Sequence, residues 1–133
     1  EPPPRGAGEL ILVAEDEPAI RDATERALVT HGYRVMLSAD GAEAISLFAR
    51  HHAQIRASLV DLAMPLLDGL AFIRAARRID PEGVFIVSSG SPNGPDHTRL
   101  APDEPGLAAV LVKPHGADLL LHTLDRVLRR SQG

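Results

Sequence analysis

Four short groups of charged and hydroxyl side chains stand where apolar runs of the chain end. These groups are Glu15-Asp16, Asp61, Ser88-Ser89 and Lys113. Carboxylates held close together repel one another and need a cation, and hard oxygen ligands of this kind suit Mg²⁺. A divalent ion, an ammonium and a hydroxyl around one carboxylate make a site for phosphoryl transfer to that carboxylate. The residue types therefore point to phosphoryl chemistry, provided that the fold brings them together.

Each group on its own has a simpler interpretation. An acidic pair after a strand equally suits the positive end of a helix. A Lys-Pro pair is usually a turn, and a serine at a strand end commonly bonds to nearby backbone. Their order along the chain, each at the end of an apolar run, is what favours a shared site.

The elements that would position these groups are strands alternating with helices. We expect strands at 10–14, 33–38, 55–60, 84–87 and 107–112, because these are short apolar runs bounded by turn residues. Apolar residues at helical spacing predict helices that open at Pro18, after Asp40, at Gly69 and at Ala117. This alternation predicts an α/β fold, a doubly wound parallel sheet with helices on both faces. Ligands of such sheets bind beyond the carboxyl ends of the strands, where all four groups would lie.

Composition shifts along the chain predict its organisation. Residues 1–9 hold three prolines and two glycines and are interpreted as a linker, 10–130 as one domain, and 131–133 as a tail. Residues 91–106 carry four prolines, which permit at most two helical turns. We expect a loop there, with a short helix near His97 to Ala101.

The bulk composition excludes several classes of function. The chain has 133 residues, 44% of them hydrophobic, which suits one domain with a real core. Its net charge of −4 argues against nucleic acid as a partner. The absence of cysteine excludes thiol chemistry and disulfides, and the absence of a long apolar run argues against direct membrane contact. The six histidines form no zinc-type cluster by spacing, and His115 is interpreted as a loop residue.

Several motifs together resemble the receiver domain of response regulators and hybrid sensor kinases. The resemblance covers Leu10 to Arg130 and rests on these stretches: Glu15-Asp16-Glu17-Pro18, Asp61-Leu62-Ala63-Met64-Pro65 with Asp68-Gly69, Ser89-Gly90 and Lys113-Pro114. It implies a flavodoxin-like (βα)5 fold with strand order 2-1-3-4-5 and a shortened or irregular fourth helix. The residues around Ile73 to Pro81 look most like the C-terminal receiver of a hybrid histidine kinase.

The resemblance also implies a role for each site residue. Asp61 would accept a phosphoryl group from a phosphohistidine, Lys113 and Ser89 would bind that group, and a cis bond before Pro114 would aim the lysine. Mg²⁺ would be held by Glu15, Asp16, Asp61 and the backbone carbonyl of Ala63. The chain would catalyse its own phosphorylation and dephosphorylation, although it contains no kinase domain. Its partner would be a histidine kinase or a histidine phosphotransfer domain, in the same or another polypeptide, and the resemblance also allows a weak homodimer. Its expected location is the cytoplasm, as a free protein or as part of a membrane-bound sensor kinase.

Two departures from the family pattern leave an alternative open. Val110 stands where receivers usually carry a Tyr or Phe that rotates on activation, and the segment before the last strand is rich in proline. A degenerate receiver that binds partners without being phosphorylated is therefore the competing hypothesis. An aspartyl-phosphate hydrolase is disfavoured, because Ala63 occupies the position of the second aspartate that such enzymes require.

Overall fold

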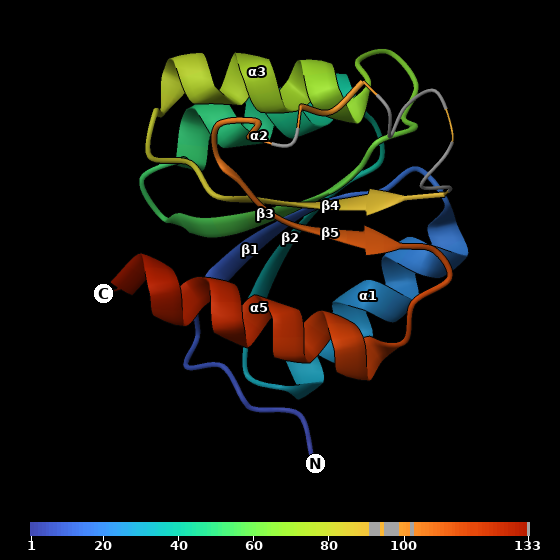
Figure 1. The fold of residues 1–133 in the computed structure, drawn as a ribbon, viewed down its shortest axis with the longest axis vertical. Helices are drawn as coiled ribbons and strands as arrows, with labels where there is room; N and C mark the ends of the chain where they lie inside the picture. Colours follow the sequence, from blue (N-terminus) through green and yellow to red (C-terminus); the bar gives the residue numbers. More distant parts are fainter. Residues whose placement is uncertain (91–93, 95–98, 102, 133) are drawn as a thin grey trace.

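A five-stranded parallel sheet forms the centre of the molecule (Figure 1). A computed structural model describes residues 1–90, 94, 99–101 and 103–132. The strand order is β2-β1-β3-β4-β5, as the family resemblance implies. The strands are β1 (Leu10–Ala14), β2 (Arg34–Ser38), β3 (Ile55–Asp61), β4 (Phe85–Ser89) and β5 (Leu107–Val112). All adjacent pairs run parallel, so the carboxyl ends of the strands share one edge.

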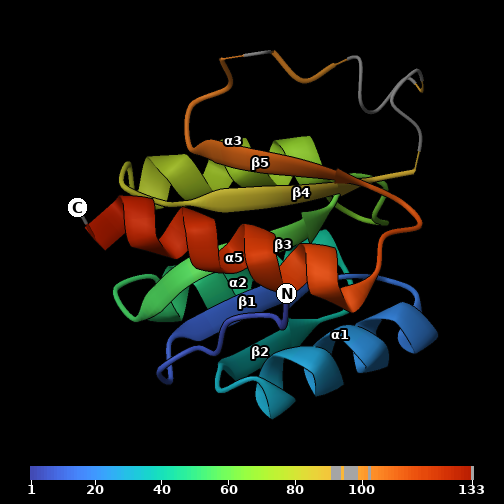
Figure 2. The ribbon, with the colours of Figure 1, turned by 60° about the horizontal axis from the view of Figure 1, so that its bottom comes forward.

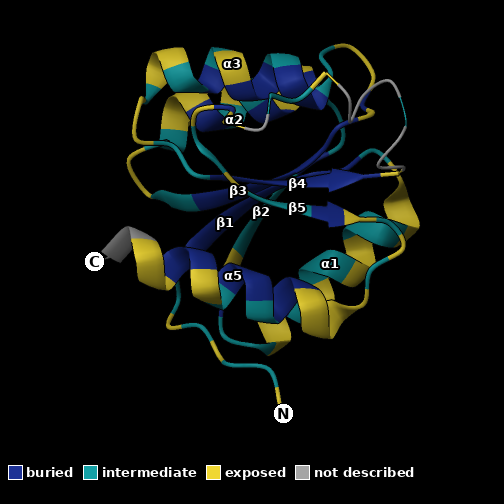
Figure 3. Ribbon diagram, viewed as in Figure 1, coloured by how far each residue is buried: buried dark blue, intermediate teal, exposed yellow. Residues whose placement is uncertain are grey.

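Helices cover both faces of the sheet, as predicted (Figures 1 and 2). One face carries α1 (Pro18–Thr30) and α5 (Ala117–Gln132), and the other carries α2 (Gly41–His51) and α3 (Gly69–Ile79). Each face has its own apolar core. Leu28 of α1 and Leu121 of α5 belong to the first core, and Phe48 of α2 and Phe72 of α3 belong to the second. Figure 3 shows the result, with buried central strands, mostly half-buried edge strands β2 and β5, and helices whose outer sides are exposed.

Local sequence signals fix where the helices begin and end. Asp40 and Asp68 are the N-caps of α2 and α3, and their carboxylates accept from the Glu43 and Ala71 N–H groups at 2.8 and 2.9 Å. Gly32 has a φ of 91°, which allows the chain to leave α1. These signals are short-range, which is why the helix starts were predictable from sequence.

Strand boundaries differ from the prediction by one or two residues in β2, which begins at Arg34, in β3, which ends at Asp61, and in β4, which spans Phe85–Ser89. Tyr33 lies outside β2, because its N–H donates to the Leu28 carbonyl at the end of α1. β4 continues to Ser89, two residues beyond the expected apolar run, because Ser88 and Ser89 still pair with β5. Hydrophobic pattern marks burial, whereas strand length is set by backbone pairing with neighbours.

The phenylalanines tie the second face together. The rings of Phe48, Phe72 and Phe85 form a cluster, with centroids 5.9 to 6.0 Å apart. Phe72 meets each of the other two edge-on, a favoured arrangement of aromatic rings. This cluster joins α2 and α3 to β4, whose far end carries the serines.

Two proline-rich segments, at the start of the chain and before β5, contain no helix or strand among their described residues. Residues 1–9 contain no helix or strand, yet Gly6 and Gly8 donate to the His31 and Gly32 carbonyls at 2.7 Å. The short helix expected near His97 to Ala101 falls mainly outside the described residues, and residues 99–101 are not helical. Within the described part of the chain, no helix is long and apolar enough to cross a membrane.

Gly69 at the start of α3 is required by close packing against the end of β3. A Cβ at this position would lie 2.5 Å from the Asp61 carbonyl oxygen and 2.7 Å from the Leu62 Cα. We expect Gly69→Ala to lower the free energy of unfolding by about 1–3 kcal/mol through overpacking, although alanine is the better helix former. Urea denaturation measures this change. Gly116→Ala is the control, because its Cβ would meet nothing within 4 Å; equal stability of the two variants would contradict the prediction.

Candidate functional site

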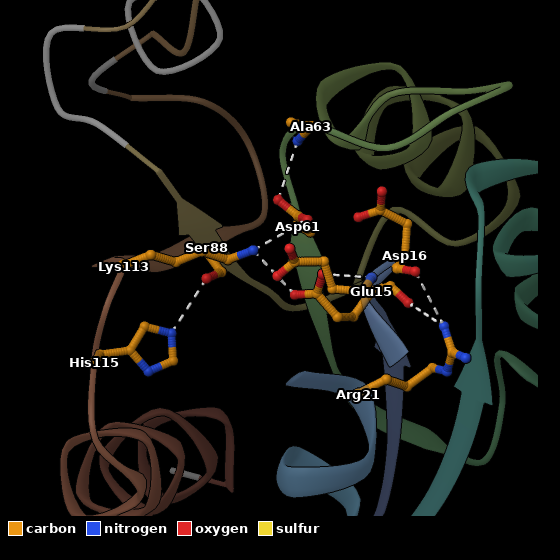
Figure 4. A network of polar contacts seen from close by, with 9 residues as sticks. Glu15, Asp16, Arg21, Asp61, Ala63, Ser88, Lys113 and His115 are labelled. Carbon is orange, nitrogen blue, oxygen red and sulfur yellow. Dashed lines mark hydrogen bonds and ion pairs between the residues drawn. The ribbon is translucent and has the colours of Figure 1, made fainter. Parts of the chain in front are cut away.

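Side chains from three strand ends meet at the carboxyl edge of the sheet (Figure 4). The Lys113 Nζ lies 3.1 Å from the Glu15 Oε1 and 3.2 Å from the Asp61 Oδ2. Both carboxylates are buried, at 5% exposure each. The Lys113–Pro114 peptide bond is cis, as the family resemblance implies. The fold therefore brings together three of the residues that the sequence placed in one site.

Three carboxylates form a cluster suited to a metal ion. Glu15, Asp16 and Asp61 each offer one oxygen, and these oxygens lie within 4.8 Å of one another. Mg²⁺ prefers hard oxygen ligands and usually keeps several waters beside one or two carboxylates. The donor set and its spacing thus fit Mg²⁺, in agreement with the sequence.

Backbone contacts hold the acidic loop after β1 in place. The Arg21 guanidinium donates to the Glu15 carbonyl at 2.9 Å and to the Asp16 carbonyl at 3.4 Å. The Glu17 N–H donates to the Glu15 Oε2 at 3.2 Å. Arg21 was not predicted as a site residue, since its distance from these carbonyls depends on how α1 leaves the loop.

The Asp61 carboxylate is held at both oxygens. Its Oδ1 accepts from the Ala63 N–H at 3.1 Å, and its Oδ2 accepts from the Lys113 ammonium. Ala63 thus reaches the site through its N–H. The predicted role of the Ala63 carbonyl as a metal ligand stays a prediction.

Burial and a neighbouring carboxylate make ionisation of Asp61 costly. Burial first, then the charge of Glu15, raise its pKa from 3.8 to about 7, against the opposing effects of the Ala63 N–H and Lys113. Burial lowers the pKa of Lys113, but Asp61 and Glu15 outweigh this and raise it above its usual value. Lys113 is therefore a firmly charged ammonium between two carboxylates that repel each other.

The two serines at the end of β4 differ in where they lie. Ser88 is the register partner of Asp61 on the neighbouring strand, so its side chain is on the same face of the sheet. Its Oγ lies 3.2 Å from the Nε2 of His115. Ser89 contributes its backbone carbonyl, which accepts from the Lys113 N–H at 2.7 Å. The predicted contact between the Ser89 hydroxyl and a phosphoryl group stays a prediction.

The Ser88–His115 pair was missed by sequence reasoning. Two adjacent serines offered a choice of face that only the register with β3 resolves, and His115 was interpreted as a loop residue. No local signal separates the two serines, because Ile86 and Val87 both belong to the core, so each serine lies two residues from a buried side chain.

Comparison with known proteins gives a family match over most of the chain. Residues 11–125 match the family described as "Response regulator receiver domain". The Response regulator MprA of Mycobacterium sp. (strain KMS) is 33% identical over 121 residues, 91% of this chain and 51% of that protein. The "Probable transcriptional regulator ycf27" of Porphyridium aerugineum is 35% identical over 122 residues, 92% of this chain and 49% of that protein. The chain thus spans about half the length of these curated relatives.

Solved structures give the same result. The receiver domain of the sensor histidine kinase PA1611 from Pseudomonas aeruginosa PAO1 is 30% identical, with a TM-score of 0.82 over 92% of this chain and 99% of that one. That structure has a magnesium ion coordinated in its active-site cleft. A receiver domain protein from Clostridium thermocellum has a TM-score of 0.84 at 24% identity, with coverage of 92% and 96%, and supports the fold alone.

The raised pKa of Asp61 predicts a pH-dependent gain in stability for Asp61→Asn in the absence of metal. Because the native state binds this proton more tightly, wild-type stability falls as the pH rises from about 4 to 7 and the penalty is complete above 7. From pH 5 to pH 8, the free energy of unfolding of Asp61→Asn should rise relative to wild type by about 2–3 kcal/mol.

Urea denaturation in EDTA at both pH values measures this difference. The exposed Asp22 on α1 supplies a matched control, and Asp22→Asn should follow the wild-type pH dependence. A pH-independent difference between Asp61→Asn and wild type would show that Asp61 ionises without cost.

Proposed function

This chain belongs to the response regulator receiver domain family, and from that premise we propose that it accepts a phosphoryl group from a phosphohistidine onto Asp61. One observation carries the proposal. The Lys113 ammonium bridges Asp61 and Glu15 at 3.2 and 3.1 Å, and the Asp16 carboxylate completes an acidic cluster beside them. A buried carboxylate flanked by a cation and by metal-binding oxygens is suited to act as an acceptor for an anionic group.

The transfer consists of one bond made and one bond broken. An oxygen of the Asp61 carboxylate forms a bond to phosphorus as the bond from phosphorus to the donor imidazole nitrogen breaks. The released imidazole takes up a proton from solvent, and the three phosphoryl oxygens move to Asp61. Lys113 lies where it neutralises charge on these oxygens, so the chain acts mainly by positioning and electrostatics.

The same acidic cluster would hold Mg²⁺ through Glu15, Asp16 and Asp61. The bound ion would neutralise the added negative charge at Asp61 and hold the phosphoryl oxygens in place. The magnesium ion in the 30% identical PA1611 receiver supports this assignment. Arg21, which holds two carbonyls of the loop, would keep the acidic pair in position for the ion.

The phosphodonor would be a histidine kinase or a histidine phosphotransfer domain. An apolar groove of about 350 Å³ lies between α1 and the start of α5 and reaches Lys113, beside the acceptor. A donor protein must approach Asp61 from nearby, and this groove offers it apolar surface to bury. We place the domain in the cytoplasm, where such donors act.

We further propose that the chain comes from a hybrid sensor histidine kinase. The 30% identity with the PA1611 receiver supports this, because that domain is part of a sensor histidine kinase. The curated relatives, a response regulator and a probable transcriptional regulator, are about twice as long as the part that this chain matches. Reading the native gene on both sides of the segment decides between the two contexts.

A receiver that binds partners without phosphorylation is the second candidate. It is favoured by Val110, an aliphatic residue packed against the core of the α2–α3 face, at the position where receivers usually carry an aromatic switch. The residue at position 110 concerns the conformational response to phosphorylation. The acceptor Asp61 itself keeps Lys113, Glu15 and Asp16 beside it. The phosphorylation experiment separates the two candidates.

Incubation with Mg²⁺ and acetyl phosphate should add one phosphoryl group to the chain. Asp61→Asn should abolish the gain in mass, and Lys113→Ala should slow it by roughly 100-fold, because one charge-stabilising donor is lost. Intact-protein mass spectrometry over time measures both. Asp22→Asn should react like wild type, and a well-folded wild type that gains no mass would favour the second candidate.

Mg²⁺ should stabilise the fold because it relieves the repulsion among the carboxylates. At a concentration 100 times its Kd, the free energy of unfolding should rise by about 2.7 kcal/mol. Asp16→Asn should weaken this response, and EDTA should reverse it in the wild type. Thermal unfolding measures the effect, with NaCl at matched ionic strength as the control. An equal rise with NaCl would show general screening of charge.

A further inference from the structure

The loop that carries Lys113 leaves the sheet immediately before this residue. The Lys113 N–H makes the last backbone bond between β5 and β4, at 2.7 Å from the Ser89 carbonyl. Three residues follow before α5 begins at Ala117. Since the lysine side chain is a flexible four-carbon stem, the position of its ammonium depends on how this loop is fixed.

A side-chain contact fixes the loop on its far side. The His115 Nε2 lies 3.2 Å from the Oγ of Ser88, and Ser88 is the register partner of Asp61 (Figure 4). The imidazole therefore joins the β5–α5 loop to the strand next to the acceptor. The backbone of Lys113 is therefore held by its own N–H bond to Ser89 and by the contact that His115 makes two residues later.

Ser88 and His115 also border the acceptor through a shared cavity. A space of about 10 Å³, close to what one water molecule needs, is lined by Glu15, Asp61, Ser88 and His115 together with apolar residues and Thr24. The contact is thus close enough to the carboxylates for a shift of the loop to be felt at Asp61.

The His115 imidazole makes its contact with Ser88 as a neutral ring. Burial first, and then the nearby Lys113 ammonium, lower the pKa of His115 below 6.5, against the opposing effect of the Gly116 backbone. A neutral ring at pH 7 leaves Lys113 as the cation that faces Glu15 and Asp61.

We propose that His115, through its hydrogen bond to Ser88, is a positioning residue that sets where the Lys113 ammonium meets the phosphoryl group. The inference rests on the proposed function, since it concerns the rate at which Asp61 is phosphorylated. It adds His115 to the site, a residue that neither the motifs of the sequence nor the metal cluster includes. Loss of the contact leaves the carboxylates in place but lets the loop move.

Phosphorylation rates of three variants test the proposal. With Mg²⁺ and acetyl phosphate at pH 7.5, Ser88→Ala and His115→Leu should each slow phosphorylation of Asp61 by roughly three- to tenfold, because a small misplacement of a catalytic group is costly. The double variant should be no slower than the slower single variant, since both changes remove the same contact.

Two further measurements distinguish positioning from packing. His115→Gln, whose amide can bond to the Ser88 hydroxyl, should recover most of the rate that His115→Leu loses. The Mg²⁺-induced rise in unfolding temperature should be the same in all variants, because the metal ligands are untouched. Ser58→Ala and His122→Leu are matched controls, as they remove a buried serine of β3 and a histidine of α5 away from the site.

The outcomes separate this inference from the proposed function. A wild-type rate in His115→Leu, with a reactive wild type, overturns the inference alone, even if Ser88→Ala is slow, because Ser88 shares the face of Asp61 and can act there without His115. Additive losses in the double variant, no rescue by His115→Gln, or a weakened response to Mg²⁺ also overturn it, because they indicate a packing role. A wild type that folds and does not react overturns both proposals.

Discussion

The site depends on one electrostatic conflict, the repulsion between the buried carboxylates of Glu15 and Asp61, and on the ammonium that relieves it. Lys113 contacts both groups at close to 3 Å, and still the pKa of Asp61 is raised to about 7. A single cation therefore does not compensate fully for the burial of two anions. A divalent cation bound at the cluster would relieve the remaining imbalance, in keeping with the Mg²⁺ site that we propose.

The rest of the fold holds the two carboxylates close together despite their repulsion. Two apolar cores, one on each face of the sheet, and a cluster of three phenylalanines stabilise the strands whose ends carry the charges. The close packing of Gly69 on the carbonyl of Asp61 fixes the end of β3. Arg21 fixes the acidic loop, and the contact between Ser88 and His115 fixes the loop of Lys113. Each charged group is thus held in position by a separate local contact.

Ion pairs connect the described residues of the segment before β5 to α3 and its N-cap. The Arg74 guanidinium lies 3.3 Å from Glu104, which is buried at 8% exposure, and Arg99 lies 3.3 Å from the N-cap Asp68 of α3. Leu100 packs against the core of the α2–α3 face. These contacts fasten the described part of the proline-rich segment to α3, a neighbour of the acceptor loop. This region therefore has ion pairs and the aliphatic Val110, whereas the family resemblance implies an aromatic residue at position 110.

The sequence by itself determined the elements and the principal site residues. Apolar runs, helix caps and the residues Glu15, Asp16, Asp61 and Lys113 at strand ends are local features, and a parallel sheet necessarily gathers strand ends at one edge. The tertiary structure alone decided that β4 extends through two serines, that Ser88 shares the face of Asp61, and that His115 and Arg21 contact the site. These facts depend on register between strands and on how loops leave the sheet. The contact of Ser88 with His115 joins residues far apart in the chain, and the contact of Arg21 with the acidic loop depends on how α1 leaves that loop, so no local sequence pattern encodes either of them.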